Sequence, residues 1–314
     1  IEANNSPISI EKNKHFQIYA DIAASTQIIL HEIVLKIFKM AHKQSGLKNF
    51  SFTGGVALNC KLISDLSKES FIDNLFIPPS PGDSGSSIGA AYFGFIHENS
   101  TSTKIKNQDH QNIYPGVFKQ DPSFLEEVLE KICDTDEIID KSSQLLLENN
   151  IIATCIDNIE TGPRSLGNRS LLCNADNLSL VKNLSENIKG REGFIPVAPS
   201  MLRETAQKYY HLSENIEFCY LTMGATAKLK NINKEFRYES VVHKDFTSRI
   251  HICDKNSYLG KLLIKINPNT EILANTSFNF SNDPVSFSYE DSIMAMKKMN
   301  LKYLVTNNGI FLVK

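Results

Sequence analysis

Two short apolar segments of this sequence each run into a glycine-bearing loop, and no other feature constrains the fold as strongly. Residues 50–52 precede Thr53-Gly54-Gly55, and residues 74–77 precede a proline-rich loop that ends in Gly82-Asp83-Ser84-Gly85. Helical periodicity follows each loop and also occupies residues 16–45. This helix–strand–helix–strand–helix order predicts α/β structure, in which loops at strand ends face helix N-termini.

Local signals place the remaining elements. Gly46 follows the long periodic stretch and suits a left-handed C-cap. The polar stretch 98–122 is typical of a linker, and the region after it predicts a mixed α+β domain. Further helices are expected at residues 56–67, 87–96, 123–133, 142–149, 178–188, 255–265 and 290–299. Further strands are expected at residues 151–156, 219–225, 248–253, 272–275, 303–306 and 310–313.

Composition bounds the class of protein. The chain has 314 residues, 41% hydrophobic and 22% charged, with a formal net charge of -2, so it suits about two globular domains rather than disorder or a nucleic-acid coat. Six scattered cysteines without a C-x-x-C pair indicate reduced thiols in a cytoplasmic protein. The start has no initiator Met and no signal-peptide pattern, and we expect no membrane span.

The two glycine-bearing loops are candidate ligand sites. Gly54 and Gly55 allow close approach of a ligand to the backbone, and helix N-terminal N–H groups favour an anion such as phosphate; a plain tight turn is the alternative. Asp83 is a natural helix cap, and it is equally placed to present a carboxylate to a metal or a nucleotide.

Basic residues punctuated by glycine and proline suggest a pocket for a polyanion. Arg164 and Arg169 flank Leu166-Gly167, and Lys189 and Arg191 follow soon after. Arginine binds phosphate oxygens through two parallel N–H groups and stays charged, although each basic pair taken alone is typical of a solvated surface. Two more segments place polar groups at strand ends: His243–Arg249 and Asn275–Asn279.

Taken together and in this order, these segments resemble the C-terminal part of the NodU/CmcH-type O-carbamoyltransferases. The resemblance is carried by TGGVALN, GDSGSSIGAA, GPRSLGNRSLL, the K-x-R-E of residues 189–192, HKDFTSR and NTSFN. It implies the fold class α/β and α+β, with a partial actin-like (ASKHA) lobe followed by a YrdC-like mixed α/β domain. The implied boundaries are 1–106 for the lobe, 107–122 for a linker and 123–314 for the YrdC-like domain.

The resemblance also implies a chemistry. Members of the family join carbamoyl phosphate and ATP into carbamoyl adenylate, with Mg²⁺ on the nucleotide. They then transfer the carbamoyl group to a hydroxyl of a natural product or sugar, near an iron-type divalent metal in the actin-like domain. The expected nucleotide contacts there are Gly54, Gly55 and Asn59, and the expected metal ligand is Asp83. The expected carbamoyl phosphate and ATP pocket consists of Arg164, Arg169, Lys189, Arg191, Arg249, Asn275, Ser277 and Asn279.

Two departures from the family pattern shape the expectations. The family's N-terminal lobe, with paired histidines that complete the metal site, has no counterpart here. Either the chain is a C-terminal fragment, or a second chain is expected to supply that lobe. Ile195 stands where the family usually has an arginine, and a charge-assisted hydrogen bond contributes about 1.5–3 kcal/mol. A non-catalytic nucleotide-binding subunit of a split carbamoyltransferase is therefore an alternative. A third hypothesis is threonylcarbamoyl adenylate synthesis for tRNA, which the near-neutral charge disfavours.

Overall fold

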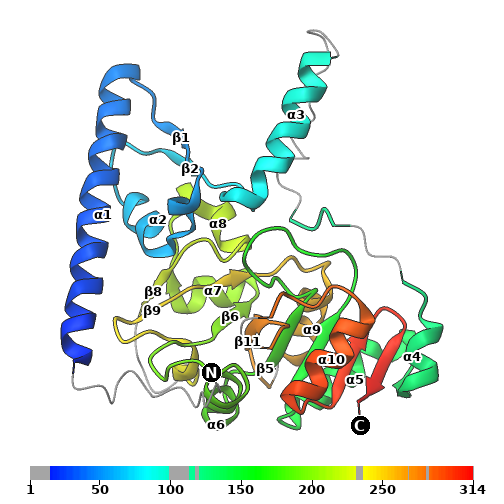
Figure 1. The fold of residues 1–314 in the computed structure, drawn as a ribbon. Helices are drawn as coiled ribbons and strands as arrows, with labels where there is room; N and C mark the ends of the chain where they lie inside the picture. The colour runs from blue at the N-terminus through cyan, green and yellow to red at the C-terminus, as the bar shows by residue number, and fades with distance from the viewer. Residues whose placement is uncertain are drawn as a thin grey trace.

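The structure, a computed structural model, describes residues 15–98, 113–116, 120–230, 236–267, 269–280 and 283–313. The chain has a mixed α/β fold (Figure 1). The long helix α1 (Phe16–Ser45) runs beside a parallel pair of strands, β1 (Asn49–Ser51) and β2 (Asn74–Phe76). A large mixed sheet is the main element of the rest of the body.

The first part of the chain follows the predicted order. α1 ends at Gly46, whose φ of 71° and N–H bond to the His42 carbonyl confirm the left-handed cap. The helix expected at residues 56–67 is divided into a 3-10 turn, η2 (Gly55–Leu58), and α2 (Cys60–Leu66). The break falls at Asn59, which accepts the N–H of Leu62 and so caps α2. A 3-10 turn, η3 (Asp83–Gly85), leads into α3 (Ser86–Glu98).

In the described residues, the large sheet has eight strands in the order β10-β6-β11-β5-β4-β12-β13-β3. Parallel pairs join β10 to β6 and β4 to β12, while the other neighbours are antiparallel. The strands are β3 (Glu130–Cys133), β4 (Ile152–Cys155), β5 (Ser170–Asn174), β6 (Ala198–Met201), β10 (His251–Ile252), β11 (Ile272–Ser277), β12 (Tyr303–Thr306) and β13 (Gly309–Leu312).

Both faces of this sheet are covered. On β4, Ile152 belongs to one apolar cluster and its neighbour Ala153 to the other, as the two-residue period of a strand requires. α9 packs with α5 on the first face, and α10 covers the second. The helices are α4 (Ser123–Val128), α5 (Ile138–Leu147), α6 (Leu178–Lys182) with the π-helix η6 (Asn183–Ile188), α7 (Arg203–Tyr209), α8 (Glu217–Leu221), α9 (Tyr258–Ile266) and α10 (Tyr289–Met299).

Three predicted elements are wrong in part. The helix expected over 123–133 ends at Val128, because residues 130–133 pair with β13 at the sheet edge. The strand expected at 219–225 is instead helix α8 and a turn. The strand expected at 248–253 splits into β9 (Thr247–Ser248) and β10, which belong to different sheets. β9 joins β7 (Tyr210–His211) and β8 (Ala227–Leu229) in a small antiparallel sheet.

α1 uses one face to join the core and leaves the other bare. Val34 and Phe38 are buried in the main apolar cluster, whereas Ile22, Ile29 and Ile37 are more than half exposed. By length and composition α1 is apolar enough to cross a membrane, which is weak evidence because core helices pass the same test. Since Val34 and Phe38 already pack against the protein, α1 is part of this fold.

The two parts of the chain are joined through α2. The hydroxyl of Ser64 donates to the Thr226 carbonyl at 2.8 Å and accepts the Thr226 N–H at 2.8 Å. The Asn215 side-chain amide donates to the carbonyls of Ser67 and Ile72. One buried cluster includes Leu62 of α2 and Tyr220 of α8. Residues before and after the expected linker therefore share a core.

Candidate functional site: an arginine pocket

Three arginines from distant segments line one cavity of about 390 Å³: Arg164, Arg191 and Arg249. Arg164 follows Gly162, whose φ of 88° and closeness to the Pro79 carbonyl, 2.3 Å from where a Cβ would stand, exclude a larger residue. Arg191 follows η6, and its N–H donates to the Ser185 carbonyl. Arg249 occupies the break between β9 and β10. The fold thus gathers cations separated by 85 positions of sequence.

The pocket holds its like charges close together. Burial lowers the pKa of Arg191, and the nearby Arg164 lowers it further. Burial, then the charge of Arg164, lowers the pKa of Arg249 to about 10. Its Nε atom is buried and lacks a hydrogen-bond acceptor among the described residues. An anion bound here would relieve the repulsion and offer that missing acceptor, which makes the pocket suited to phosphate or carboxylate groups.

The end of β11 supports the pocket from one side. Arg191 donates from Nη2 to Thr276 Oγ1 at 2.7 Å. Lys189, only 6% exposed, donates from Nζ to Asn279 Oδ1 at 2.7 Å and to the Ser277 carbonyl at 3.0 Å. Burial, with a contribution from Arg191, lowers the pKa of Lys189 to about 8. The Asn-Thr-Ser-Phe-Asn segment therefore positions two of the predicted cations.

Asn275 lies deeper than its predicted role suggested. Its side chain is buried and donates to the Ser165 carbonyl at 3.1 Å and to Ser200 Oγ at 3.0 Å. These bonds tie β11 to the turn that carries Arg164. Its Oδ1 is buried without a partner among the described residues. Asn275 thus supports the Arg164 turn rather than lining the cavity.

Arg169 does not join the other three arginines. Its side chain is fully buried, and Nη1 donates to the Ile156 carbonyl at 2.7 Å and to its neighbour's carbonyl at 2.9 Å. The carboxylate of Glu160 accepts the N–H groups of Leu166, Asn168 and Arg169. The predicted five-cation pocket is therefore three arginines with Lys189 beside them, while Arg169 is placed to hold the loop in shape.

The cavity also has an apolar part of its lining, to which Ile195, Pro196, Val197 and Ala198 contribute. Other lining residues were not indicated by the sequence patterns. Cys60 and Lys61, from the start of α2, also line the cavity, so both parts of the chain contribute to it. No motif singled out Cys60; its position directly after Asn59 in the TGGVALN segment was the available signal. The pocket lining thus combines cationic and apolar side chains.

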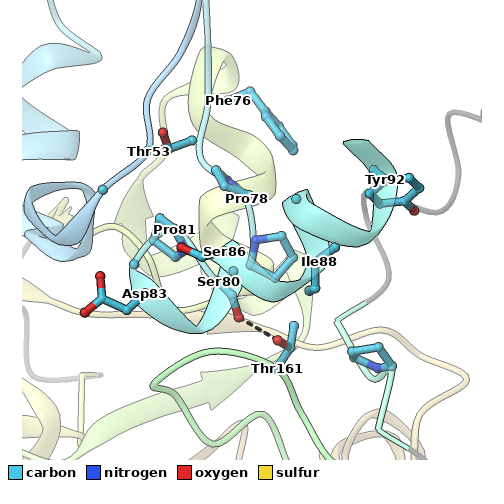
Figure 2. A pocket seen from close by; sticks show the side chains of 16 residues that line it. Thr53, Phe76, Pro78, Ser80, Pro81, Asp83, Ser86, Ile88, Tyr92 and Thr161 are labelled. Atoms are coloured by element: carbon cyan, nitrogen blue, oxygen red, sulfur yellow. Dashed lines mark hydrogen bonds between the residues drawn. The ribbon is translucent and has the colours of Figure 1, made fainter. Parts of the chain in front are cut away.

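A second cavity, of about 830 Å³, lies at the carboxyl ends of β1 and β2 (Figure 2). Gly54 and Asp83 line it, and the Gly54 N–H donates to the Pro81 carbonyl at 2.6 Å, which joins the two glycine-bearing loops. Figure 2 shows the hydrogen bond, 2.5 Å long, between the hydroxyls of Ser80 and Thr161. Parallel strands thus bring both predicted loops to one edge.

The remaining predicted residues of this region have other surroundings. Gly55 begins η2 and is not among the residues that line the cavity, and Asn59 is occupied by the α2 cap and by a 2.8 Å bond to Gln27 Oε1. Asp83 is exposed, and no cluster of three metal-ligating side chains occurs within the described part of the chain. Asp83 alone does not make a metal site.

Comparison with known proteins places the chain. A family model described as carbamoyltransferase C-terminus matches residues 143–313, and one described as carbamoyltransferase N-terminus matches residues 5–92. The chain belongs to the carbamoyltransferase family. The resemblance to NodU-type O-carbamoyltransferases predicted from the motifs is confirmed.

Similar curated proteins include two nodulation proteins. Nodulation protein NolNO of Sinorhizobium fredii is 27% identical over 95% of this chain and 44% of its own length. Nodulation protein U of Rhizobium fredii is 30% identical over 76% of this chain and 39% of its own length. An uncharacterized Synechocystis protein is 27% identical over 92% of this chain and 52% of its own length. The chain spans about half the length of the curated relatives it matches.

Similar solved structures cover the larger part of the fold only loosely. Full-length HypF in a phosphate- and nucleotide-bound form aligns with 57% of this chain and 24% of its own, with a TM-score of 0.39 and 20% identity. A variant of Sua5 from P. abyssi aligns with 56% of this chain and 47% of its own, with a TM-score of 0.38 and 13% identity.

Proposed function

We propose that this chain activates a carbamoyl group at the arginine pocket and passes it to a small-molecule hydroxyl, of a natural product or a sugar. Carbamoyl phosphate, ATP and water would give carbamoyl adenylate, phosphate and pyrophosphate, and the acceptor hydroxyl would then displace AMP. Family membership supports carbamoyl transfer. The observation that supports the adenylation step is the convergence of Arg164, Arg191 and Arg249 on one cavity.

The pocket's charge suits that reaction. Adenylation brings a carbamate oxygen against the α-phosphate, so two anionic groups approach each other. Guanidinium groups fixed beforehand offset that repulsion and the charge that develops in the transition state. The apolar residues from Ile195 to Ala198 line the same cavity, where they would exclude water from the carbamoyl group. Lys189 would hold the end of β11 in place, since its ammonium bonds to Ser277 and Asn279.

The test is carbamoyl-phosphate-dependent exchange of pyrophosphate into ATP, assayed with Mg²⁺ and the full chain. The Arg249→Gln variant is expected to lower exchange by about 10²-fold or more, the loss typical when one preorganised donor is removed. Arg237→Gln is the matched control, because Arg237 is exposed, pairs with Asp176 and lies outside the cavity. Equal exchange in both variants would refute the assignment.

We propose that transfer of the carbamoyl group to the acceptor hydroxyl needs a second protein lobe. The resemblance assigns residues 1–106 to the second lobe of an actin-like domain, and a first lobe, from a longer form of this chain or from a partner chain, would complete it. The large cavity at Gly54 and Asp83 would face that partner. An iron-type divalent metal at Asp83 would need ligands beyond the described residues, since these hold no cluster of three. Adenylate formation as proposed involves no residue of this second cavity.

A non-catalytic nucleotide-binding subunit is the second candidate, and Ile195 favours it. This side chain lines the arginine pocket at the position where the family resemblance implies a further arginine. Such a subunit would bind ATP but support no exchange, even with the partner chain added. Exchange that depends on threonine and bicarbonate, instead of carbamoyl phosphate, would point to threonylcarbamoyl adenylate.

A further inference from the structure

One cysteine differs from the other five in its surroundings. Cys60 is partly exposed and lines the arginine pocket, whereas the other five are buried. Burial raises the pKa of Cys173 and of Cys219 to about 12, which keeps those thiols protonated and unreactive near neutral pH. Cys60 is therefore the thiol that a reagent dissolved in water reaches.

Two guanidinium groups face this thiol. Arg164 Nη2 lies 3.8 Å from Cys60 Sγ, and the side chain of Arg249 also contacts it. The thiol in turn lies 3.6 Å from the Leu58 carbonyl and 3.5 Å from the Met223 carbonyl. These cations attract anionic reagents into the cavity that Cys60 lines.

The buried Nε of Arg249 adds a second, independent sign that the cavity takes an anion. That donor lacks an acceptor among the described residues, and an unpaired buried donor costs about 1–3 kcal/mol. An anion that supplies the acceptor would lie between Arg164 and Arg249, where Cys60 Sγ is in contact with both. A bound anion and a substituent on Sγ would thus compete for one space.

We propose that Cys60 is a covalent modification site for small anionic electrophiles, and that its modification and the binding of a phosphate-bearing ligand exclude each other. With iodoacetate, Sγ would displace iodide, a sulfur–carbon bond would form, and the thiol proton would pass to water. The proposal rests on the arginine pocket of the proposed function, but not on which anion fills it or on whether adenylation follows.

The test compares iodoacetate with iodoacetamide, two reagents with the same reaction and different charge. Rates at the Cys60 peptide are measured by mass spectrometry on the folded chain, with N-acetylcysteine as reference. The ratio of iodoacetate to iodoacetamide rates is expected to exceed the reference ratio by about tenfold or more at low salt, and to fall as salt rises. Pyrophosphate is expected to slow iodoacetate labelling.

Two variants test whether the charge of the pocket, rather than the exposure of Cys60 alone, sets the rate of labelling. Arg249→Gln is expected to bring the rate ratio close to the reference value, while Arg237→Gln leaves it high. If Arg249→Gln fails to fold, the salt dependence and pyrophosphate protection of the wild type still decide. The proposal would be overturned if the ratio of iodoacetate to iodoacetamide rates at Cys60 equalled that of N-acetylcysteine. It would also be overturned if pyrophosphate did not slow the labelling of Cys60 by iodoacetate. If pyrophosphate protects Cys60 but the chain supports no exchange of pyrophosphate into ATP, the adenylation function is refuted while the modification site is retained.

Discussion

The loops at Gly54 and Asp83 and the loops at Arg164 and Arg191 carry motifs of equal clarity, yet the chain surrounds them differently. Asp83 and its neighbours on α3 are exposed, α3 has no buried residue, and Figure 1 shows this helix extending away from the body. Arg191 and Lys189, by contrast, are bonded to Thr276 and Asn279 of the β11 segment.

This difference separates a site that the chain completes from one that it only begins. The arginine pocket has cationic and apolar lining residues and a supporting strand, all from this chain. The described residues that line the second cavity are glycines, prolines, hydroxyl-bearing residues and a few apolar side chains, with one carboxylate and no basic group. We therefore expect the first site to bind its ligand unaided and the second to depend on another lobe.

Stability should show the largest contrast between buried α2 and bare α3. Leu62 of α2 is fully buried in the main cluster, so Leu62→Ala is expected to lower the free energy of unfolding by about 2–5 kcal/mol. Phe93 of α3 is 73% exposed, and Phe93→Ala should change the free energy of unfolding by less than about 0.5 kcal/mol. Urea unfolding measures both. Similar losses would mean that α3 is packed in solution.

Exchange activity should separate the two cavities next. Arg191→Gln is expected to reduce carbamoyl-phosphate-dependent exchange by about 10²-fold, since it removes a guanidinium from the pocket. Asp83→Asn should leave exchange within about twofold, because Asp83 lies in the other cavity, and a twofold change is about 0.4 kcal/mol. A large loss from Asp83→Asn would show that adenylate formation involves both cavities.

A smaller effect should come from relieving repulsion inside the arginine pocket. The positive charge of Arg164 lowers the pKa of both Arg191 and Arg249, because it repels the positive charges of their guanidinium groups. Arg164→Met is expected to stabilise the fold by about 1 kcal/mol and at the same time to weaken pyrophosphate binding. Thermal unfolding measures the gain in stability, and calorimetric titration measures the loss of pyrophosphate affinity. Loss of stability together with unchanged binding would mean that Arg164 is a structural residue.

A separate effect concerns pH. Burial holds the pKa of Lys189 at about 8 in the folded chain, below its ordinary value of about 10.4. Between these values the unfolded chain binds more protons, so the contribution of Lys189 to stability rises with pH. The stability of the wild type relative to Lys189→Met should therefore increase from about pH 8 to pH 10. Urea unfolding at several pH values measures the difference in free energy of unfolding between the two proteins. A difference that stayed constant from about pH 8 to pH 10 would contradict the prediction.

Sequence periodicity predicted elements whose packing is local. α1, α10 and the β12–β13 pair lie where the apolar spacing and the caps indicated them. The expected strand over 248–253 was wrong as one element, because Arg249 turns the chain from one sheet into another. Periodicity in one segment carries no information about which sheet its halves join.

The site was predictable in part for a similar reason. Arg164 and Arg169 look alike in the sequence, yet Arg169 is buried against backbone carbonyls and only Arg164 reaches the cavity. Cys60 becomes part of the pocket through its approach to Arg164, a residue 104 positions away. Motif spacing identifies the cations, whereas long-range packing decides which of them meet.

The most direct test of the central claim is a crystal structure of this chain with AMP and pyrophosphate. Phosphate oxygens are expected within hydrogen-bond distance of Arg191 and Arg249, with Arg249 Nε donating to one of them. No phosphate is expected at Gly54 and Asp83 in the absence of a partner. Phosphate bound at Gly54 and Asp83, with the arginine pocket left without an anion, would contradict the account.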